Sequence, residues 1–382
     1  MLKASKKKLA FAGPWITEKE IEFVAQAARE GWYEIFDKYM VGFEDEVKKY
    51  FGVKYAIGTH CCTQALHLAA ASLDLGPGDE VIVTDHSWIA TAYSITYTGA
   101  TCVFVDIDPQ TLCIDPVAIE KAITPQTKAI MLVHNFGIPA DMDEIISIAK
   151  KHKLKIIEDA APSLGALYKG KKCGTFGDIG CISFQGAKIA AASEGGVYMT
   201  DNEELFRKAS LLASMGRTDR CAPFWSDQIG YQYTIGSLPA AMATIQIQRA
   251  DELVANKRNI YRMYAERIAN HPMVDMVKEK PDTFANYCYP SVFLKDSVKI
   301  SAADVIAKLK ELNIHCRPGF PQMSTFPVYE KDKRFENPVA KRFFERGIVL
   351  PGAHNLVEED VELICNNFIE IMISGVPEEM AY

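Results

Sequence analysis

The feature that most constrains the fold is a regular alternation of strand-like and helix-like segments through residues 53–200. One unit, DEVIVTDHSWIATAYSITYTGATCVFVDID, has the order strand, loop, helix, strand. A second unit, KAIMLVHNFGIPADMDEIISIAKKHKLKIIEDAA, repeats that order. Strands that alternate with helices form a mostly parallel sheet, because each helix carries the chain back to the edge where the previous strand began. We therefore predict a large domain of the α/β class.

The length of the chain and its C-terminal pattern predict a second, smaller domain. With 382 residues, of which 48% are hydrophobic, the chain is long enough to bury two cores. Short strands followed by helices after about residue 270 indicate an α+β fold for the C-terminal part. We place the large domain at residues 1–250 and the small domain at residues 251–382.

Two helical segments lie outside the alternating region. Residues 17–30 begin with a capping box, Thr17 to Glu20, and carry apolar residues at helical spacing. This N-terminal helix can pack on the small domain. A long helical stretch over residues 237–268 links the two domains, and Pro239 predicts a kink near its start.

Composition and charge exclude several kinds of partner. The net charge of -7 is spread without a basic block, which argues against nucleic acid and against an anionic membrane surface. No apolar run approaches the ~20 residues of a membrane span, and the apolar stretch near the N-terminus is too short for a signal peptide. The cysteines are dispersed and lack the spacing of zinc sites, so we predict no metal site and reduced thiols in a cytoplasmic protein. They are Cys61, Cys62, Cys102, Cys113, Cys173, Cys181, Cys221, Cys288, Cys316 and Cys365.

Lys188 is the first candidate for chemistry. It lies in the stretch CISFQGAKIAAASEGGV, where a short apolar run leads into a loop of small residues and a Glu-Gly-Gly turn. A lysine held in such a loop loses side-chain entropy and hydration. Partial burial and nearby charge lower the pKa of a lysine, so its amine can trap a carbonyl compound. A surface lysine is the alternative that this stretch alone leaves open.

Asp159 adds a second element. It ends the run LKIIED, whose first four residues have the character of a buried parallel strand. Carboxylates at the carboxyl end of such a strand lie at the ligand crevice of an open α/β sheet. A carboxylate there can keep a pyridine nitrogen protonated, which pyridoxal 5′-phosphate (PLP) needs to act as an electron sink. An N-cap for the following Ala-Ala segment is the alternative. The lysine and the aspartate together predict a PLP site, which neither predicts alone.

Two further segments can contribute to the same crevice. In HCCTQALHLAAASLDLG a turn of small residues leads directly into a helix, and the backbone N–H groups of Cys62 and Thr63 can hold a phosphate there. A plain N-cap is the alternative for Thr63. Trp88 follows the strand-like run Val81–Val83 and can present an aromatic face to a planar cofactor. Core packing is the alternative for Trp88.

With these residues in place, the chain resembles the DegT/DnrJ/EryC1/StrS aminotransferases over almost its whole length. The similarity is specific in order and spacing, and is carried by EGWYEIFDKYMVGFEDEVKKYFGVKYAIGT, CCTQALHLAAASLDLGPGDEVIV, FVDIDPQTLCIDPVAIEKAITPQTKAI, IEDAAPSLGALYKGKKCGTFGDIGCISFQGAK and EGGVYMTDNEEL. The resemblance implies the aspartate-aminotransferase fold, PLP as the cofactor, and amination of keto-sugars that are mostly nucleotide-linked. It also implies a homodimer in which a loop of each subunit completes the site of the other.

The resemblance implies a role for each residue near the cofactor ring. Lys188 matches the lysine that holds PLP as a Schiff base and then shuttles the proton. Asp159 matches the partner of the pyridine nitrogen. Trp88 matches the ring that stacks on the cofactor.

It also implies how the cofactor phosphate is held. Ser183, with the backbone of Cys62 and Thr63, matches the phosphate-binding residues of the family. Gln232 stands where the family has an asparagine that reaches the phosphate of the neighbouring subunit, which is a conservative exchange.

Several positions depart from the family pattern. Pro162 replaces a Gln or His three residues after the aspartate, and Ser193 replaces the glycine before Glu-Gly-Gly. Thr234 replaces an arginine, which removes a bidentate clamp for carboxylate or phosphate. In the same segment, an acidic residue and a glutamine are replaced by Ser237 and Pro239. Three arginines are candidates to supply the missing cation, each with a plain surface position as the alternative: Arg217, Arg220 and Arg317.

We therefore predict a PLP-dependent aminotransferase that moves an amino group from an amino acid, with L-glutamate expected, to a nucleotide-linked keto-sugar in surface-glycan or secondary-metabolite biosynthesis. The altered loop leaves open a small phosphorylated ketone, such as dihydroxyacetone phosphate, or an aminocyclitol precursor. A sugar dehydratase of the same fold has histidine in place of the lysine, so Lys188 argues against it. A non-catalytic regulator would need a DNA-binding segment, and the sequence shows none.

Overall fold

The computed structural model describes residues 2–217, 225–332 and 334–374. Its main sheet has seven strands in the order β1-β9-β8-β5-β4-β2-β3. All strands run parallel except β9, which is antiparallel to both of its neighbours. The predicted α/β fold with a mostly parallel sheet is confirmed. The strands are β1 (Tyr55–Thr59), β2 (Glu80–Thr84), β3 (Thr101–Val105), β4 (Thr127–Val133), β5 (Lys155–Asp159), β8 (Ile179–Ser183) and β9 (Gly196–Thr200).

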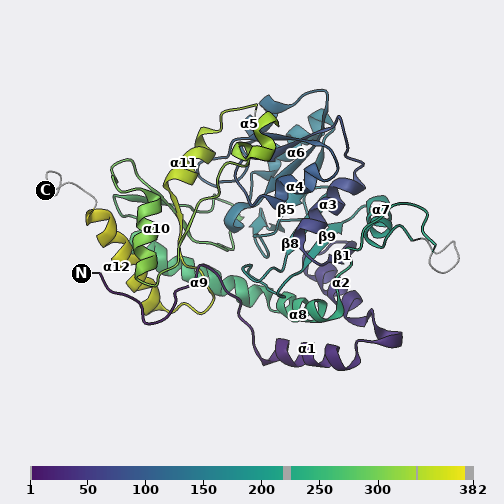
Figure 1. Ribbon diagram of the computed structural model, residues 1–382, viewed down its shortest axis with the longest axis horizontal. Coiled ribbons are helices and arrows are strands. Elements are labelled where there is room, and N and C mark those ends of the chain that lie inside the picture. Colours follow the sequence, from purple (N-terminus) through teal and green to yellow (C-terminus); the bar gives the residue numbers. More distant parts are fainter. Residues whose placement is uncertain (1, 218–224, 333, 375–382) are drawn as a thin grey trace.

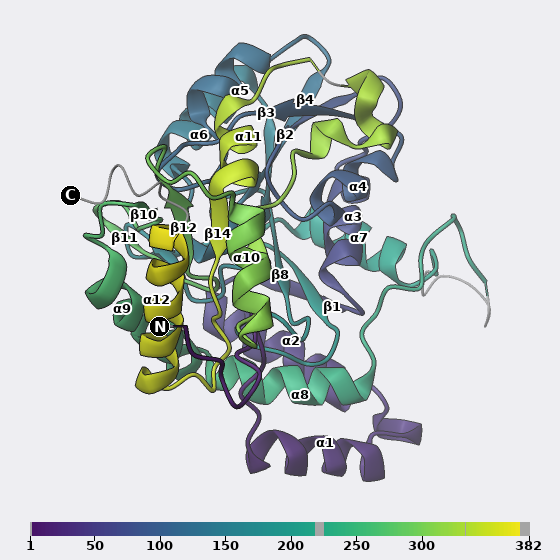
Figure 2. The ribbon, with the colours of Figure 1, turned by 60° about the vertical axis from the view of Figure 1, so that its left-hand side comes forward.

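Helices cover both faces of this sheet (Figure 2). On one face Ala65, Ala92 and Ala209 pack with Val81 and Val83 in one hydrophobic core. On the other face helices α5 and α6 bury a second core that includes Ile82 and Val103 of the neighbouring strands. Coverage on both faces explains why the strands are continuously apolar. The helices are α3 (Cys62–Ser72), α4 (Ala90–Thr96) and α7 (Glu203–Ala213) on the first face, and α5 (Pro116–Ala122) and α6 (Met142–His152) on the second.

The predicted kink at Pro239 is wrong. The helical stretch divides at Arg249 instead, where the backbone leaves the helical region between α8 (Ser237–Gln248) and α9 (Ala250–Ile268). Pro239 is the third residue of α8, and the first N–H groups of a helix have no intrahelical acceptor. A proline there removes no hydrogen bond, so the helix stays straight.

The N-terminal part of the chain has two sections that lie against different parts of the molecule (Figure 1). Helix α1 (Glu18–Glu30) has the predicted capping box, and it packs on α8 rather than on the small domain. It is followed by the short helix η1 (Tyr33–Ile35) and by α2 (Lys38–Phe51), which also packs on α8. The preceding segment, residues 3–12, is the part that reaches the small domain, because Leu9 pairs with Ile314.

The C-terminal part forms a four-stranded antiparallel sheet in the order β10-β12-β14-β13. Val305 of α10 and Phe368 of α12 pack on this sheet in a third hydrophobic core. The strand-then-helix composition agrees with an α+β fold, and the boundary at 250/251 stays a prediction. The elements are β10 (Val274–Met276), β12 (Ser291–Leu294), α10 (Ala302–Glu311), β13 (Arg317–Pro318), α11 (Pro338–Arg346), β14 (Gly347–Val349) and α12 (Glu358–Ser374).

One segment of this C-terminal part returns to the main sheet. The buried carboxylate of Asp85, just after β2, accepts hydrogen bonds from Gln322, Ser324 and Asn337. Tyr329 packs in the same core as α3 and α4. Residues from both parts of the chain therefore meet at the end of β2. The remaining short elements are η2 (Asn135–Gly137), η3 (Met323–Thr325), η4 (Pro327–Asp332), β6 (Leu167–Tyr168), β7 (Lys171–Lys172) and β11 (Thr283–Phe284).

Among the described helices, none combines the length and the apolar character that crossing a bilayer requires. The described cysteines are all free thiols, and eight of these nine are buried. Cys221 lies outside the described residues.

Candidate active site

Lys188 lies in a tight loop between β8 and β9. The two sides of the loop are joined by hydrogen bonds from Ala192 N to Phe184 O (2.7 Å) and from Gly186 N to Ser193 O (3.0 Å). Ser193 adopts a left-handed conformation, with φ of 68°, which explains why the family has glycine there. The partly buried Lys188 places its Nζ 5.8 Å from the centre of the Tyr289 ring.

Asp159 ends β5 and is buried. Its Oδ2 accepts a hydrogen bond from Thr91 Oγ1 (2.7 Å), and its Oδ1 accepts one from Ala161 N (3.2 Å). No helix follows, so the alternative of a helix N-cap is wrong: the next residues form turns. Burial raises the pKa of Asp159, while the hydrogen bond from Thr91 and the positive charge of Lys188 act in the opposite direction. A protonated ring nitrogen beside this carboxylate would supply the charge that burial otherwise leaves without a close partner.

Glu158, the other half of the acidic pair, has a different environment. Successive strand residues point to opposite faces, so Glu158 turns away from Asp159. Its carboxylate accepts hydrogen bonds from the N–H groups of Gly174, Phe176 and Gly177 and from Nε2 of His134 (2.9 Å). Glu158 thus anchors the loop before β8, and only Asp159 faces the crevice.

The start of α3 lies beside the end of β8. Ser183 pairs with Gly196, and a Cβ atom on Gly196 would come within 2.5 Å of the backbone nitrogen of Cys62. Glycine is therefore required for β9 to pass so close to the helix. Cys61 is the N-cap of α3, so the N-cap alternative for Thr63 is wrong. In the described chain no hydrogen bond satisfies the N–H groups of Cys62 and Thr63, as a phosphate-binding helix start requires.

Trp88 lies on the loop between β2 and α4. Its side chain is 64% exposed, so the alternative of core packing is wrong. The nearest aromatic ring is that of Phe320, 6.5 Å away from centre to centre. Thr91, three residues later, hydrogen-bonds Asp159, so the loop that carries Trp88 borders the same crevice.

Gln232 lies on the segment that precedes α8, where it pairs with Ser214. Its exposed amide contacts Thr234 Oγ1 at 3.4 Å, within its own loop. Thr234 pairs with Thr59 at the end of β1, which places this loop next to the start of α3. No contact among the described residues joins Gln232 to Lys188 or Asp159, and its role toward a second subunit stays a prediction.

Pro162, which departs from the family pattern, and the candidate arginines lie in different surroundings. Pro162 is buried, and its carbonyl accepts a hydrogen bond from Asn286 Nδ2 (2.9 Å). Arg217 is exposed, and its guanidinium contacts the sulfur of Met215. Arg220 lies outside the described residues. Arg317 lines a cleft together with Gly186 and Ala187, the two residues before Lys188.

Sequence reasoning missed the residues that hold the chain just after Lys188. Gln246 Oε1 accepts a hydrogen bond from Ala191 N (3.0 Å), and His354 Nε2 donates one to Ile189 O (3.0 Å). Asn256 donates to the other ring nitrogen of His354, which fixes the proton on Nε2. Gln246 is a buried polar residue in an otherwise apolar helix run, AAMATIQI, and that contrast is the signal that could have found it.

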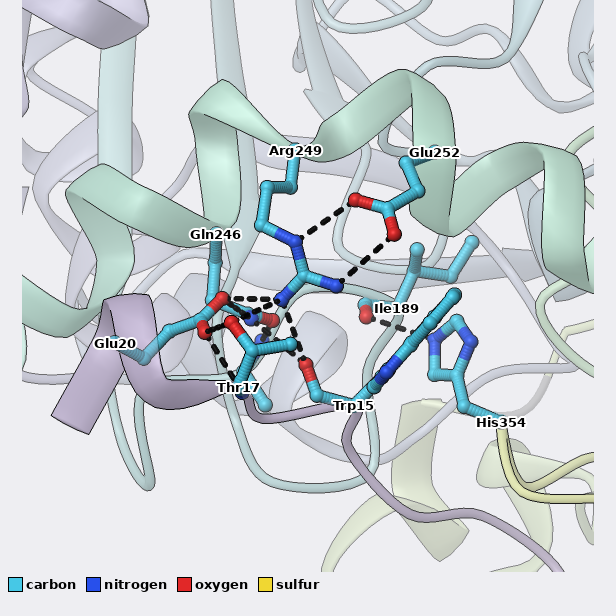
Figure 3. A network of polar contacts seen from close by, with 9 residues as sticks. Trp15, Thr17, Glu20, Ile189, Gln246, Arg249, Glu252 and His354 are labelled. Atoms are coloured by element: carbon cyan, nitrogen blue, oxygen red, sulfur yellow. Dashed lines mark hydrogen bonds and ion pairs between the residues drawn. The ribbon is translucent and has the colours of Figure 1, made fainter.

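The network extends from Gln246 to the N-terminal helix (Figure 3). Gln246 Nε2 donates to Glu20 Oε1 (2.7 Å), and Glu20 also pairs with Arg249, which bridges to Glu252. Burial alone would raise the pKa of Glu20, but the hydrogen bonds from Thr17 and Arg249 hold it below its usual value. The buried charges of Glu20 and Arg249 therefore neutralise each other.

These residues fit PLP. A buried carboxylate, two unpaired N–H groups at a helix start with a serine beside them, and a lysine in a tight loop suit its ring nitrogen, its phosphate and its aldehyde. Lys188 interacts electrostatically with both Asp159 and Cys62, so the three parts are close together. The chemical groups that PLP needs thus meet at the carboxyl ends of β5 and β8.

Comparisons with known proteins agree with this geometry. The model of the DegT/DnrJ/EryC1/StrS aminotransferase family matches residues 14–369. The GDP-perosamine synthase of Caulobacter vibrioides is 34% identical over 372 residues, which cover 96% of this chain and 99% of that protein. The GDP-perosamine synthase of Escherichia coli O157:H7 is 36% identical over 357 residues, or 94% and 96% of the two chains.

A solved structure shows the same fold. The PLP form of Spr1654 from Streptococcus pneumoniae superposes with a TM-score of 0.90 at 25% identity, and the match covers 97% of this chain and 100% of that one. The chain therefore belongs to the DegT/DnrJ/EryC1/StrS aminotransferase family and is a PLP-dependent aminotransferase.

Proposed function

We propose that this enzyme transfers the amino group of L-glutamate to a nucleotide-linked keto-sugar, with Lys188 as its catalytic residue. The observation that carries the chemistry is the meeting of Lys188, the buried Asp159 and the open start of α3 in one crevice. The sugar acceptor is supported by the two GDP-perosamine synthases that the chain resembles over more than nine-tenths of its length.

Each residue of the site has its own role. PLP, when bound, supplies an aldehyde that accepts the amine and a ring that withdraws electrons from the reacting carbon. Asp159 keeps the ring nitrogen protonated, and Thr91 orients its carboxylate. Ser183 and the N–H groups of Cys62 and Thr63 hold the phosphate, and Trp88 covers the ring. Lys188 Nζ first holds the cofactor and, once released, carries the proton to and from the substrate carbon.

We also propose that the enzyme works as a homodimer. An apolar surface follows α1, where Tyr33 is 87% exposed, and Ser237 Oγ ties Phe36 O to the start of α8. Burying such a surface against a second copy is favourable, and a two-fold axis would bring Gln232 toward the neighbouring phosphate. The exposed apolar residues of this region are Trp32, Tyr33, Ile35, Phe36, Val41 and Leu238. The free thiols of the described cysteines support a cytoplasmic location.

A half-reaction tests the acceptor. The purified enzyme is converted to the amino form of the cofactor with excess glutamate, the donor is removed, and acceptors are added singly. Return of the absorbance of the lysine-bound cofactor with a nucleotide keto-sugar, and not with dihydroxyacetone phosphate, is the expected result. Return with the small phosphorylated ketone alone would contradict the proposed acceptor, and no conversion by glutamate would contradict the donor.

A further inference from the structure

Tyr289 comes from the C-terminal part of the chain and lies against the loop of Lys188. Its hydroxyl donates a hydrogen bond to Ala187 O (2.9 Å), the carbonyl just before the lysine. The side chain is buried, and burial raises the pKa of the Tyr289 phenol well above its usual value, so the hydroxyl keeps its proton and stays a donor. Tyr289 therefore fixes the backbone at the residue that precedes Lys188.

Other aromatic rings hold the ring of Tyr289 in place. Phe11, from the N-terminal segment, is stacked on it with 4.7 Å between the ring centres and 17° between the planes. Phe136 of η2 contacts it edge-on, with 6.2 Å between the ring centres. Three residues before Tyr289, Asn286 Nδ2 donates to Pro162 O (2.9 Å) in the turn that follows β5. The ring therefore has a fixed place relative to both the lysine loop and the end of β5.

The amine of Lys188 lies over this ring. Its Nζ is 5.8 Å from the ring centre, within the range at which an aromatic face attracts an ammonium group. In the part of the chain that the structure describes, the Lys188 side chain makes no hydrogen bond or ion pair, so the ring of Tyr289 is its close partner. The attraction of a cation to a ring is weaker than a buried ion pair, so it can hold the amine and still release it.

We infer that Tyr289 is a positioning residue for the reaction: its hydroxyl fixes the backbone before Lys188, and its ring holds the amine at the crevice whenever the amine is not bonded to the cofactor. The inference rests on the proposed role of Lys188. When Lys188 Nζ takes the proton from the substrate carbon it becomes positively charged, and the face of the ring stabilises that charge. A tyrosine that only fills the core is the alternative, and it would act on stability alone.

The first test compares two forms of the cofactor on the full-length enzyme after the cofactor has been removed. PLP is captured when Lys188 Nζ bonds its aldehyde carbon and the aldehyde oxygen leaves as water, whereas pyridoxamine phosphate has no aldehyde and binds without that bond. Calorimetry with pyridoxamine phosphate therefore reports the folded pocket, and the absorbance of the lysine-bound cofactor after PLP is added reports the lysine.

We expect Tyr289→Leu to slow the capture of PLP about tenfold, because the amine is no longer held at the crevice. The affinity for pyridoxamine phosphate should stay within about twofold of that of the parent, which verifies that the variant is folded. Equal losses with the two forms of the cofactor, or capture of PLP at the rate of the parent, would overturn the inference.

Tyr289→Phe and Tyr261→Phe form a matched pair. Each loses a hydroxyl that donates to a carbonyl oxygen at 2.9 Å, Ala187 O in the first case and Val277 O in the second. Both should lose stability by a similar amount, but only Tyr289→Phe should slow the capture of PLP, by about threefold, because it frees the backbone before Lys188 and keeps the ring. Capture at the rate of the parent in Tyr289→Phe would overturn the role of the hydroxyl. Capture as slow as in Tyr289→Leu would overturn the role of the ring.

The exchange of the α-proton of glutamate with deuterated water, followed by NMR on the holoenzyme, reports the proton transfer by Lys188 itself. We expect the exchange rate to fall about tenfold in Tyr289→Leu and about threefold in Tyr289→Phe, with the KM for glutamate as in the parent. Equal exchange rates in Tyr289→Leu and the parent would overturn the stabilisation of the charge by the ring.

The same proteins separate this inference from the proposed function. If the parent captures PLP and aminates a nucleotide keto-sugar while Tyr289→Leu matches it in capture and in exchange, the function stands and the inference fails. If the parent aminates no nucleotide keto-sugar but Tyr289→Leu captures PLP more slowly than the parent, the proposed acceptor fails and the inference stands.

Discussion

The chain on the two sides of Lys188 has opposite surroundings. Before it, Gly186 and Ala187 line an open cleft. The same cleft is lined by Lys8, Lys310 and Arg317, which have no ion-pair partners in the described structure. After it, Ile189 and Ala191 are buried, and their backbone groups are bound by His354 and Gln246. The open side can take up a charged ligand, and the closed side holds the lysine in place while the ligand changes.

The two sides also respond to different disturbances. Exposed cations act through attraction that salt screens, so removing one weakens ligand binding and changes stability little. Buried hydrogen bonds act through the cost of leaving a group unpaired, about 1–3 kcal/mol for each group. Substitutions on the closed side should therefore appear first in the free energy of unfolding and then in turnover.

The largest effect is expected at the residue between the two sides. Lys188→Ala removes the amine that both holds the cofactor and carries the proton, so turnover should fall about a thousandfold or more. Absorbance of the lysine-bound cofactor should be lost. Lys121→Ala, an exposed lysine on α5, is the control. Undiminished turnover in Lys188→Ala would refute the catalytic assignment.

The next largest effect is expected at Gln246, which supports the closed side. Gln246→Leu leaves Ala191 N without an acceptor and removes the hydrogen bonds to Glu20 and to Trp15 O. The free energy of unfolding should fall by about 3 kcal/mol, as measured by denaturant titration. Turnover should fall about tenfold with the cofactor still bound, since Lys188 is less well fixed.

A matched control is the exposed Gln248 two residues later, where Gln248→Leu should change neither quantity. A loss of stability in Gln246→Leu without any change in kcat would show that this support does not extend to Lys188.

A pH dependence sharpens the comparison at His354. Burial lowers the pKa of His354 to about 3, with further lowering by Lys257 and Arg249. The unfolded chain therefore takes up a proton below about pH 6.5 that the folded chain refuses, so stability is lost as the pH falls through that value. The variant His354→Gln has no group that takes up this proton, so this loss of stability should be absent from it. Between pH 7.5 and pH 5 the stability of the parent should fall relative to the variant by about 2 kcal/mol.

The control is His60→Gln, which makes the same substitution at an exposed histidine and reports the effect of the exchange itself. Parallel pH curves for the parent and His354→Gln would mean that His354 is not held neutral in the folded enzyme.

The smallest effect concerns strain in the closed loop. Ser193 has φ of 68°, which costs a residue with a Cβ about 1 kcal/mol. Ser193→Gly should raise the free energy of unfolding by about that amount, because the carbonyl that accepts from Gly186 N is kept. Ser210→Gly, inside helix α7, should instead lower stability. A loss of stability in Ser193→Gly would show that the serine side chain contributes more than its strain costs.

The fold was predictable because its signals are local. Alternating apolar runs predicted the parallel sheet, and the capping box from Thr17 to Glu20 predicted the start of α1 within one residue. The prediction of a kink at Pro239 was wrong because the effect of a proline depends on its position in the helix. In the first turn a proline removes no hydrogen bond. At the break, Arg249 forms ion pairs with Glu20 and Glu252, and the former spans more than two hundred residues, so no local pattern could have indicated it.

The candidate site was predictable to the same extent. Lys188 and Asp159 lie in short motifs whose spacing carries the family resemblance, and the structure brings them together. Gln246 and His354 could not be found in this way, because each contacts the Lys188 loop from a distant segment without a motif of its own. The sequence left an N-cap open as the alternative for Thr63, because helix starts are uncertain by a residue or two from sequence alone, and the structure gives that position to Cys61.

The first residues of the chain have their partners among the last. Lys3 exchanges two hydrogen bonds with Asn367, 364 positions later, and Leu9 pairs with Ile314. During synthesis the main sheet can form once residue 200 has emerged, whereas this N-terminal segment must stay undocked until nearly the whole chain is made. Lys8, which lines the cationic cleft, belongs to the same segment. This wall of the cleft is therefore among the last parts of the enzyme to assemble, after the main sheet that carries Asp159.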